Sequence, residues 1–114
     1  MKCLNWNLEW RTPRSAGGKW IVEKIREVDP DVSCLTEVTE ALIPEGEVLR
    51  ADLDYGYGNK GDRRKVVLWS REPWTDIDLV GDPELPSGRF VSGVTLGIRF
   101  IGVCIPWQSA HVST

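Results

Sequence analysis

Apolar positions in the first third of the chain recur with the period of a helix. Within residues 19–28, Ile21, Ile25 and Val28 are spaced four and then three positions apart, which predicts one apolar stripe on an amphipathic helix. Charged residues occupy the positions between them. Pro30 follows, and we expect the helix to end before it, because the residue preceding a proline disfavours helical backbone.

Shorter apolar runs on both sides of this helix predict strands. Residues 2–9 and 31–38 flank the helix, and the order strand, helix, strand is typical of a right-handed crossover between parallel neighbours. Further strands are expected at residues 48–53 (an edge strand), 65–70, 74–80, 89–96 and 98–105, with a helical turn at 39–42. One early helix followed mostly by strands indicates the α+β class.

Composition and charge restrict the kind of protein. The 114 residues fit one domain, and 41% apolar with 27% charged residues is typical of a soluble globular chain. No apolar run reaches the ~18–20 residues of a membrane span, and the first residues lack the apolar stretch of a secretory signal. With a net charge of −3, contact with nucleic acid requires a local basic patch or a bound cation.

The three cysteines are widely spaced. Cys3, Cys34 and Cys104 include no Cys-x-x-Cys pair, which argues against a zinc site and against a disulfide framework. Each lies in an apolar run, so we expect reduced thiols in the core. A reducing, cytoplasmic location follows from that interpretation.

Polar side chains stand where the first two strands end. Asn7 and Glu9 close the first strand, and Glu37 closes the second. If these strands are parallel neighbours, their carboxyl ends lie together and the side chains can reach one ion. Oxygen ligands of this kind suit Mg²⁺ or Mn²⁺ rather than zinc. On these grounds alone, ordinary solvated carboxylates remain the alternative interpretation.

The order of these residues resembles the endonuclease/exonuclease/phosphatase superfamily. The sequence CLNWNLEW at residues 3–10 is similar to that family's opening strand, which ends in Trp-Asn. The sequence DPDVSCLTE at residues 29–37 is similar to its Pro-Asp-Val motif and the following strand, which ends in Glu. Residues 64–70 and 102–107 resemble its core strand and the strand that leads into its active-site loop.

The resemblance implies a fold, an activity and roles for residues. The expected fold is the N-terminal half of a two-sheet β-sandwich flanked by helices, here as one incomplete domain over residues 1–114. The expected activity is Mg²⁺-dependent hydrolysis of phosphoester bonds in nucleic acid, a phosphorylated small molecule or a lipid head group. Glu37 would be the metal ligand, Asn7 would belong to the metal and phosphate network, and Glu9 would lie near the ion. The alternative is a truncated, non-catalytic binding or structural domain.

Two signatures of that family are absent from this sequence, namely Gly-Asp-x-Asn and the later Ser-Asp-His. Residues 81–84 superficially resemble the first, but Gly-Asp-Pro predicts a turn. His111 is the only histidine, and it is a candidate catalytic residue because the loop after this strand carries an active-site His or Tyr in some members. An exposed tail imidazole is its alternative interpretation. We therefore expect a catalytically incomplete chain whose open sheet face favours self-association.

The basic run at residues 63–65 and the tryptophans have two interpretations each. The basic run can contact phosphate or form a solvated strand start. Trp10 and Trp107 lie at loop edges and can line a groove, whereas Trp20 and Trp69 lie in amphipathic elements and are expected in the core.

Overall fold

Seven strands, one α-helix and one 3₁₀ turn make up the described part of the chain, in a computed structural model that describes residues 1–52, 62–84 and 88–105. The elements are β1 (Cys3–Asn7), α1 (Ala16–Val28), β2 (Val32–Thr39), η1 (Glu40–Leu42), β3 (Glu47–Arg50), β4 (Arg63–Ser70), β5 (Thr75–Asp78), β6 (Phe90–Thr95) and β7 (Ile98–Val103). They agree with the predicted α+β class and with the predicted order of elements. At 13 residues α1 is too short to cross a bilayer, and no longer helix exists in the described ranges.

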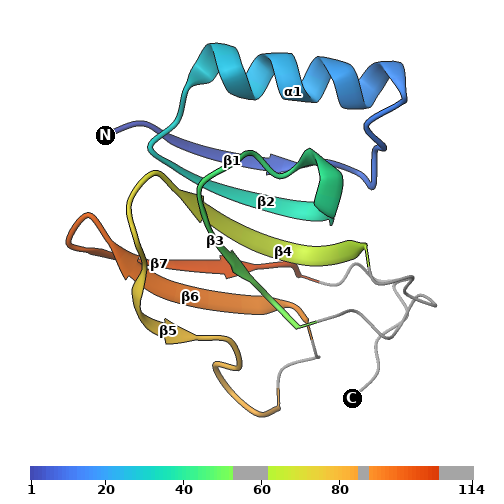
Figure 1. Ribbon diagram of the computed structural model, residues 1–114. Coiled ribbons are helices and arrows are strands. Elements are labelled where there is room, and N and C mark those ends of the chain that lie inside the picture. Colours follow the sequence, from blue (N-terminus) through green and yellow to red (C-terminus); the bar gives the residue numbers. More distant parts are fainter. Residues whose placement is uncertain (53–61, 85–87, 106–114) are drawn as a thin grey trace.

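The strands form two sheets. The first has the order β1-β2-β4-β3 and the second the order β5-β6-β7. As predicted, β1 and β2 are parallel neighbours, with Cys3 opposite Val32 and Asn7 opposite Thr36. β4 is antiparallel to both β2 and β3, which leaves β3 at the sheet edge, again as predicted. Figure 1 shows α1 over one face of the first sheet and the second sheet on the other side.

Helix α1 begins three residues before the expected start because a cap precedes it. Ser15 is the N-cap, and its Oγ accepts a hydrogen bond from the Gly18 N–H at 2.9 Å. Such a bond satisfies one of the unpaired donors of the first turn. At the other end, Asp29 adopts left-handed backbone with φ 52° and donates its N–H to the Ile25 carbonyl at 2.9 Å. Pro30 then prevents continuation, as the sequence predicts.

Two apolar clusters hold the layers together. The first lies between α1 and the four-stranded sheet, and the second lies between the two sheets. The first cluster comprises Leu8, Ile21, Ile25, Leu35, Val38, Leu42 and Val67. The second comprises Leu49, Ala51, Val66, Leu68 and Val91, with Cys34, Trp74, Phe100 and Cys104 packed against it.

β7 lies across the first sheet and runs in the same direction as β2. Phe100, early in β7, shares a cavity lining with Val32, early in β2. Two residues further along each strand, a Cβ on Gly102 would lie 3.3 Å from the Cys34 Sγ. The ends of β2 and β7 therefore lie at the same side of the molecule, where β4 begins (Figure 1).

Two side chains expected in the core are exposed instead. Trp20 is 53% exposed, because it lies one position away from the stripe of Ile21 and packs edge-on against Trp6 with ring centroids 5.6 Å apart. Cys3 is exposed on the edge strand β1. Trp69 confirms its prediction at 8% exposure. The pattern of apolar residues thus predicted the strand or helix correctly, but it did not predict how deeply each apolar side chain is buried.

The second sheet exposes large apolar side chains. They belong to β5 and β7 and to the residues that follow these strands: Ile77, Leu79, Val80, Ile98, Ile101, Val103 and Ile105. In the ranges that the structure describes, no helix packs on this sheet.

Two neighbouring glycines in the first turn of α1 provide a matched pair of substitutions. A Cβ on Gly18 would collide with the Thr12 carbonyl oxygen, whereas a Cβ on Gly17 would meet only the flexible side chain of Arg11, at 3.2 Å. We expect Gly18→Ala to lower the free energy of unfolding by about 1–3 kcal/mol through overpacking. Gly17→Ala should leave it unchanged or raise it by up to about 1 kcal/mol, because alanine favours helix. Urea unfolding of the two variants measures both, and equal losses would contradict the cap geometry.

Candidate functional site

The structure brings Asn7 and Glu37 to neighbouring positions at the carboxyl ends of β1 and β2. Asn7 is the last residue of β1 and pairs with Thr36, and Glu37 is the next residue along β2. Asn7 is exposed and Glu37 is half-buried. Glu9 follows two residues after β1 and is exposed. The parallel pairing that would bring these residues together is therefore confirmed, while their role as metal ligands stays a prediction.

The backbone at this edge is tightly held and strained. Past the end of β1, the Leu8 N–H donates to the Thr36 carbonyl at 2.8 Å and the Trp10 N–H donates to the Glu37 carbonyl at 2.9 Å. Glu9, Trp10 and Glu37 all have left-handed backbone, with φ of 53°, 60° and 50°. Each such non-glycine residue costs of order 1 kcal/mol or more, and strain of this kind concentrates at functional sites. The hydrogen bonds to β2 offset that cost.

The left-handed residue in β2 changes the alternation of its side chains. Leu35 and Val38 belong to the same cluster under α1, although regular alternation would send residues three apart to opposite faces. The left-handed turn at Glu37 accounts for the difference. Asn7 continues the row of Asn5, whose side chain lines a cavity between the sheets, so Asn7 lies on the face turned toward the second sheet.

Oxygen donors at this edge fit a hard cation that keeps some of its waters. The Asn7 Oδ1 accepts the Glu9 N–H at 2.9 Å, which fixes the orientation of the amide and leaves one lone pair on that oxygen. Glu9 lies 3.5 Å from Arg11, in a pair whose side chains are 68% and 53% exposed. Among the described residues, no group of three or more His, Cys, Asp or Glu converges. One or two carboxylates with water and phosphate are a common Mg²⁺ environment.

The arginines of the basic run at the start of β4 make specific contacts with other side chains. The Arg63 guanidinium lies 5.5 Å from the centroid of the Trp10 ring. Arg64 pairs with Glu40 at 3.2 Å and donates to the Ala51 carbonyl at 2.8 Å. Both arginines are half-buried. The alternative of a merely solvated strand start is therefore wrong, and Trp10 contacts a cation at the edge of the candidate site.

Lys65 is the last residue of the basic run, for which the sequence left phosphate contact or a solvated strand start open. It is only 4% exposed. It lies between the β4 partners of Thr36 and Val38, which places it across the ladder from Glu37. A buried lysine is rare and brings a positive charge to the strand that carries the candidate ligand. Its burial is signalled in the sequence only by its position directly before a run of apolar residues.

Two further sequence predictions concern the later part of the chain. His111, the candidate catalytic histidine, and Trp107 lie outside the described residues. The interpretation of residues 81–84 as a turn is confirmed, because the Asp82 Oδ1 accepts the Glu84 N–H at 2.9 Å. Residues 81–84 thus belong to loop structure at the end of β5.

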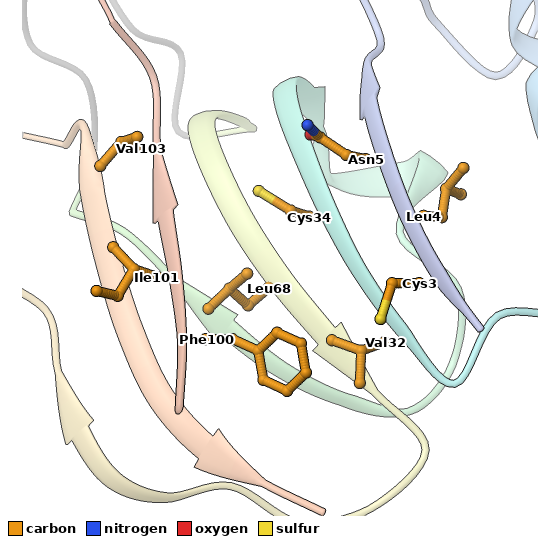
Figure 2. A pocket seen from close by; sticks show the side chains of 9 residues that line it. All are labelled: Cys3, Leu4, Asn5, Val32, Cys34, Leu68, Phe100, Ile101 and Val103. Atoms are coloured by element: carbon orange, nitrogen blue, oxygen red, sulfur yellow. The ribbon is translucent and has the colours of Figure 1, made fainter. Parts of the chain in front are cut away.

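A cavity of about 300 Å³ lies between the sheets beside β1 and β7 (Figure 2). Its lining is mostly apolar and includes Cys3, Cys34 and Asn5. Burial disfavours the thiolate and, with a smaller contribution from nearby Cys104, raises the pKa of the Cys34 thiol to about 11. Cys34 is therefore a neutral thiol at physiological pH.

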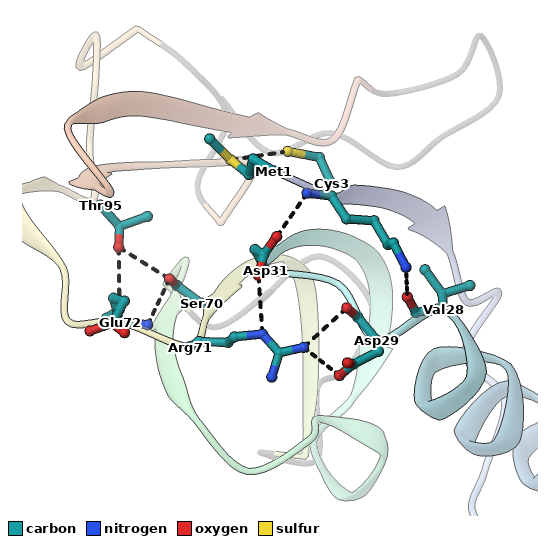
Figure 3. Close-up of polar contacts among 10 residues, drawn as sticks. Met1, Cys3, Val28, Asp29, Asp31, Ser70, Arg71, Glu72 and Thr95 are labelled. Atoms are coloured by element: carbon teal, nitrogen blue, oxygen red, sulfur yellow. Dashed lines mark hydrogen bonds and ion pairs between the residues drawn. The ribbon is translucent and has the colours of Figure 1, made fainter.

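The amino end of β2 carries a polar network that ties elements together (Figure 3). Arg71 pairs with Asp31 at 3.2 Å and also with the Asp29 carboxylate, and it donates to the Asp29 carbonyl at 3.0 Å. The Lys2 main-chain N–H donates to Asp31 at 2.8 Å. That bond first, and Arg71 second, lower the pKa of Asp31. This network joins β1, α1 and β4 at the opposite end of the sheet from Glu37.

Comparisons with known proteins support the fold. No family model matches the chain, and no curated protein is detectably similar in sequence. Among solved structures, an AP endonuclease from Archaeoglobus fulgidus matches with a TM-score of 0.63 and 21% identity, over 93% of this chain and 41% of that chain. The chain therefore has an endonuclease-like fold and spans less than half of the length of that neighbour.

The environments of Cys3 and Cys34 predict a large difference in reactivity. At pH 8 we expect an aromatic disulfide reagent to modify exposed Cys3 rapidly. Cys34, which is half-buried and whose pKa lies near 11, should react much more slowly. Stopped-flow labelling followed by peptide mass spectrometry measures each site. Labelling of Cys34 as fast as that of Cys3 would contradict its half-buried, neutral state, and full labelling in urea serves as the control.

Proposed function

We propose that this chain supplies the metal-binding edge of a Mg²⁺- or Mn²⁺-dependent phosphoester hydrolase of the nuclease kind. The observation that carries the proposal is the position of Glu37, half-buried at the carboxyl end of β2 beside Asn7, in a chain whose fold is similar to an AP endonuclease. Carboxyl ends of neighbouring parallel strands are where side chains of α/β sheets converge on ligands.

The roles follow from the donors at this edge. Glu37 would ligate the cation, and Asn7, with its amide oriented by the Glu9 N–H, would hold the cation or a phosphate oxygen. Glu9 stands two residues away as a further oxygen donor. A cation bound there polarises a phosphoryl oxygen and stabilises the leaving oxyanion. Lys65, across the ladder from Glu37, limits the negative charge that accumulates at this edge.

The substrate class follows from charge and from the structural neighbour. The chain has a net charge of −3, so a polyanion must be held locally, and Arg63 on the ring of Trp10 is a cation at that edge. The neighbour is an AP endonuclease, which favours nucleic acid over a phosphorylated small molecule or lipid head group. We interpret the chain as the N-terminal part of a two-sheet sandwich that works in a reducing, cytoplasmic setting.

Activation of the attacking water would depend on groups beyond these residues. Such acid–base assistance contributes about 10²–10⁴-fold, and the sequence contains neither Gly-Asp-x-Asn nor Ser-Asp-His to supply it. His111 is the candidate to line the site. We therefore expect the chain alone to bind cation without measurable turnover of plasmid DNA or an aryl phosphodiester. The alternative function, a non-catalytic binding domain, also predicts no turnover. Cation binding distinguishes the two, because only the proposed function requires a cation site at Glu37.

Glu37→Gln tests the metal assignment. We expect Mn²⁺ to broaden the amide resonances of Leu8 and Thr36 in the wild-type chain, and Glu37→Gln to weaken that binding about ten-fold or more, because a neutral amide replaces the carboxylate ligand. The matched control is Glu47→Gln, an exposed carboxylate at the opposite end of the sheet, paired with Ser70. Equal Mn²⁺ affinity in wild type and Glu37→Gln, or equal loss in both variants, would overturn the assignment.

A further inference from the structure

β7 is an edge strand with one open side. In the part of the chain that the structure describes, β7 pairs with β6 alone, at one end of the order β5-β6-β7. The Cys104 N–H donates to the Arg89 carbonyl at 3.0 Å, so the even-numbered residues of this antiparallel ladder bond to β6. The main-chain N–H and C=O groups of Arg99, Ile101 and Val103 therefore point away from β6, toward the open side.

The same residues bring apolar side chains to this edge. Ile101 is 60% exposed and Val103 is 43% exposed. Arg99 is the one charged residue of β7, and its guanidinium donates to the Ser92 Oγ at 2.9 Å, which turns it back over β6. Proteins usually protect an edge strand with charged side chains, a proline or a bulge. β7 has no proline, and its register with β6 is continuous.

The other edges of the two described sheets carry polar side chains. Charges lie on β3 and β5, and amides lie on β1: Glu47 and Arg50, Asp76 and Asp78, and Asn5 and Asn7. Polar side chains oppose the addition of a strand, because pairing would remove water from them. β7 is thus the least protected edge of the described sheets.

The cavity of about 300 Å³ lies beside this edge. Ile101 and Val103 line it together with residues of β1. Apolar side chains at such a position keep their surface in contact with water, and burying that surface is favourable. A strand added along β7 would reduce the exposure of both side chains. The unpaired main-chain groups and the exposed apolar groups therefore call for the same occupant.

We propose that a second copy of this chain pairs its β7 with this edge, antiparallel and about a two-fold axis. Two-fold pairing requires a strand that complements itself. With Ile101 opposite Ile101 of the second copy, Val103 of each copy lies opposite Arg99 of the other. All three open residues of β7 then exchange main-chain hydrogen bonds. This register joins the two isoleucines and keeps the two arginines apart.

Charge favours a second copy as the occupant, and area sets the affinity. Residues 100–105 carry no charge, so the edge offers no complement to an acidic or a basic partner. A second β7 is uncharged at the same positions and apolar in the same alternation. One added strand buries less than the ~800 Å² per partner of a standard interface. We therefore expect a dissociation constant of roughly 10–100 µM.

The first experiment is sedimentation equilibrium of the 114-residue chain with a reductant and a chelator. The reductant prevents crosslinking through exposed Cys3, and the chelator separates pairing from the proposed metal site. We expect the average mass to rise from that of one chain toward that of two between about 1 and 300 µM. A chain that stays monomeric over this range, or that grows beyond a dimer without limit, would overturn the proposal.

The second experiment compares Ile101→Lys with Ile77→Lys. Ile77, the control, is 51% exposed on β5, at the opposite edge of the same sheet. We expect Ile101→Lys to weaken the dimer about ten-fold or more, because two lysines would face each other at the axis, and Ile77→Lys to leave it unchanged. Melting temperatures check that both variants are folded. Equal weakening by the two variants would identify association through the exposed sheet face and contradict pairing along β7.

The third experiment is hydrogen exchange at low and high chain concentration. The amides of Ile101 and Val103 should exchange fast in the monomer and about ten-fold or more slowly in the dimer. The amides of Phe100 and Gly102, which bond to β6, should exchange slowly at both concentrations and serve as the control. If Ile101 and Val103 are already slow in the monomer, another segment of the same chain covers this edge, and the proposal is wrong.

Discussion

The parallel ladder between β1 and β2 is the constraint on which the candidate site depends. It places Asn7 opposite Thr36 and continues beyond β1 through the bonds of Leu8 and Trp10 to β2. Parallel neighbours need a crossover, and α1 supplies it while burying the face of the sheet beneath it. Without that register Glu37 would have no fixed relation to Asn7. The strained residues at this edge are tolerated because the same ladder holds them.

The two ends of the first sheet differ in role: one carries a stabilising polar network, and the other carries the candidate site. At the amino end of β2, Arg71 and the aspartates around it form a network in which cations and carboxylates are matched, and Ser70 bonds Thr95 across the sheets at 3.1 Å. The carboxyl end instead carries buried cations near the candidate ligand. Lys65 and Arg89 are buried there, while Glu37 stands at a strained position.

Sequence patterns predicted the order of elements because periodicity and proline positions are local signals. The end of β1 at Asn7 could be found in the same way, whereas β2 continues two residues past Glu37 to Thr39. The earlier start of α1 was missed because Ser15 and the glycines read as a loop, and only the cap reveals a helix. The left-handed backbone of Glu37 and the burial of Arg89 depend on how distant strands pack, which no local pattern encodes. Family resemblance supplied the candidate ligands but gave no indication of these two features.

The sheets are not equally close along their width. On the side of β3 and β6, a Cβ on Gly93 would lie 2.6 Å from the Leu49 Cδ1, so the Leu49 side chain packs directly on the backbone of β6. On the side of β1 and β7, a cavity of about 300 Å³ separates them. Several of the residues that line this cavity are exposed, so it opens to solvent. Water should therefore enter the space between the sheets first along β1 and β7, whereas the packing of Leu49 on Gly93 excludes it along β3 and β6.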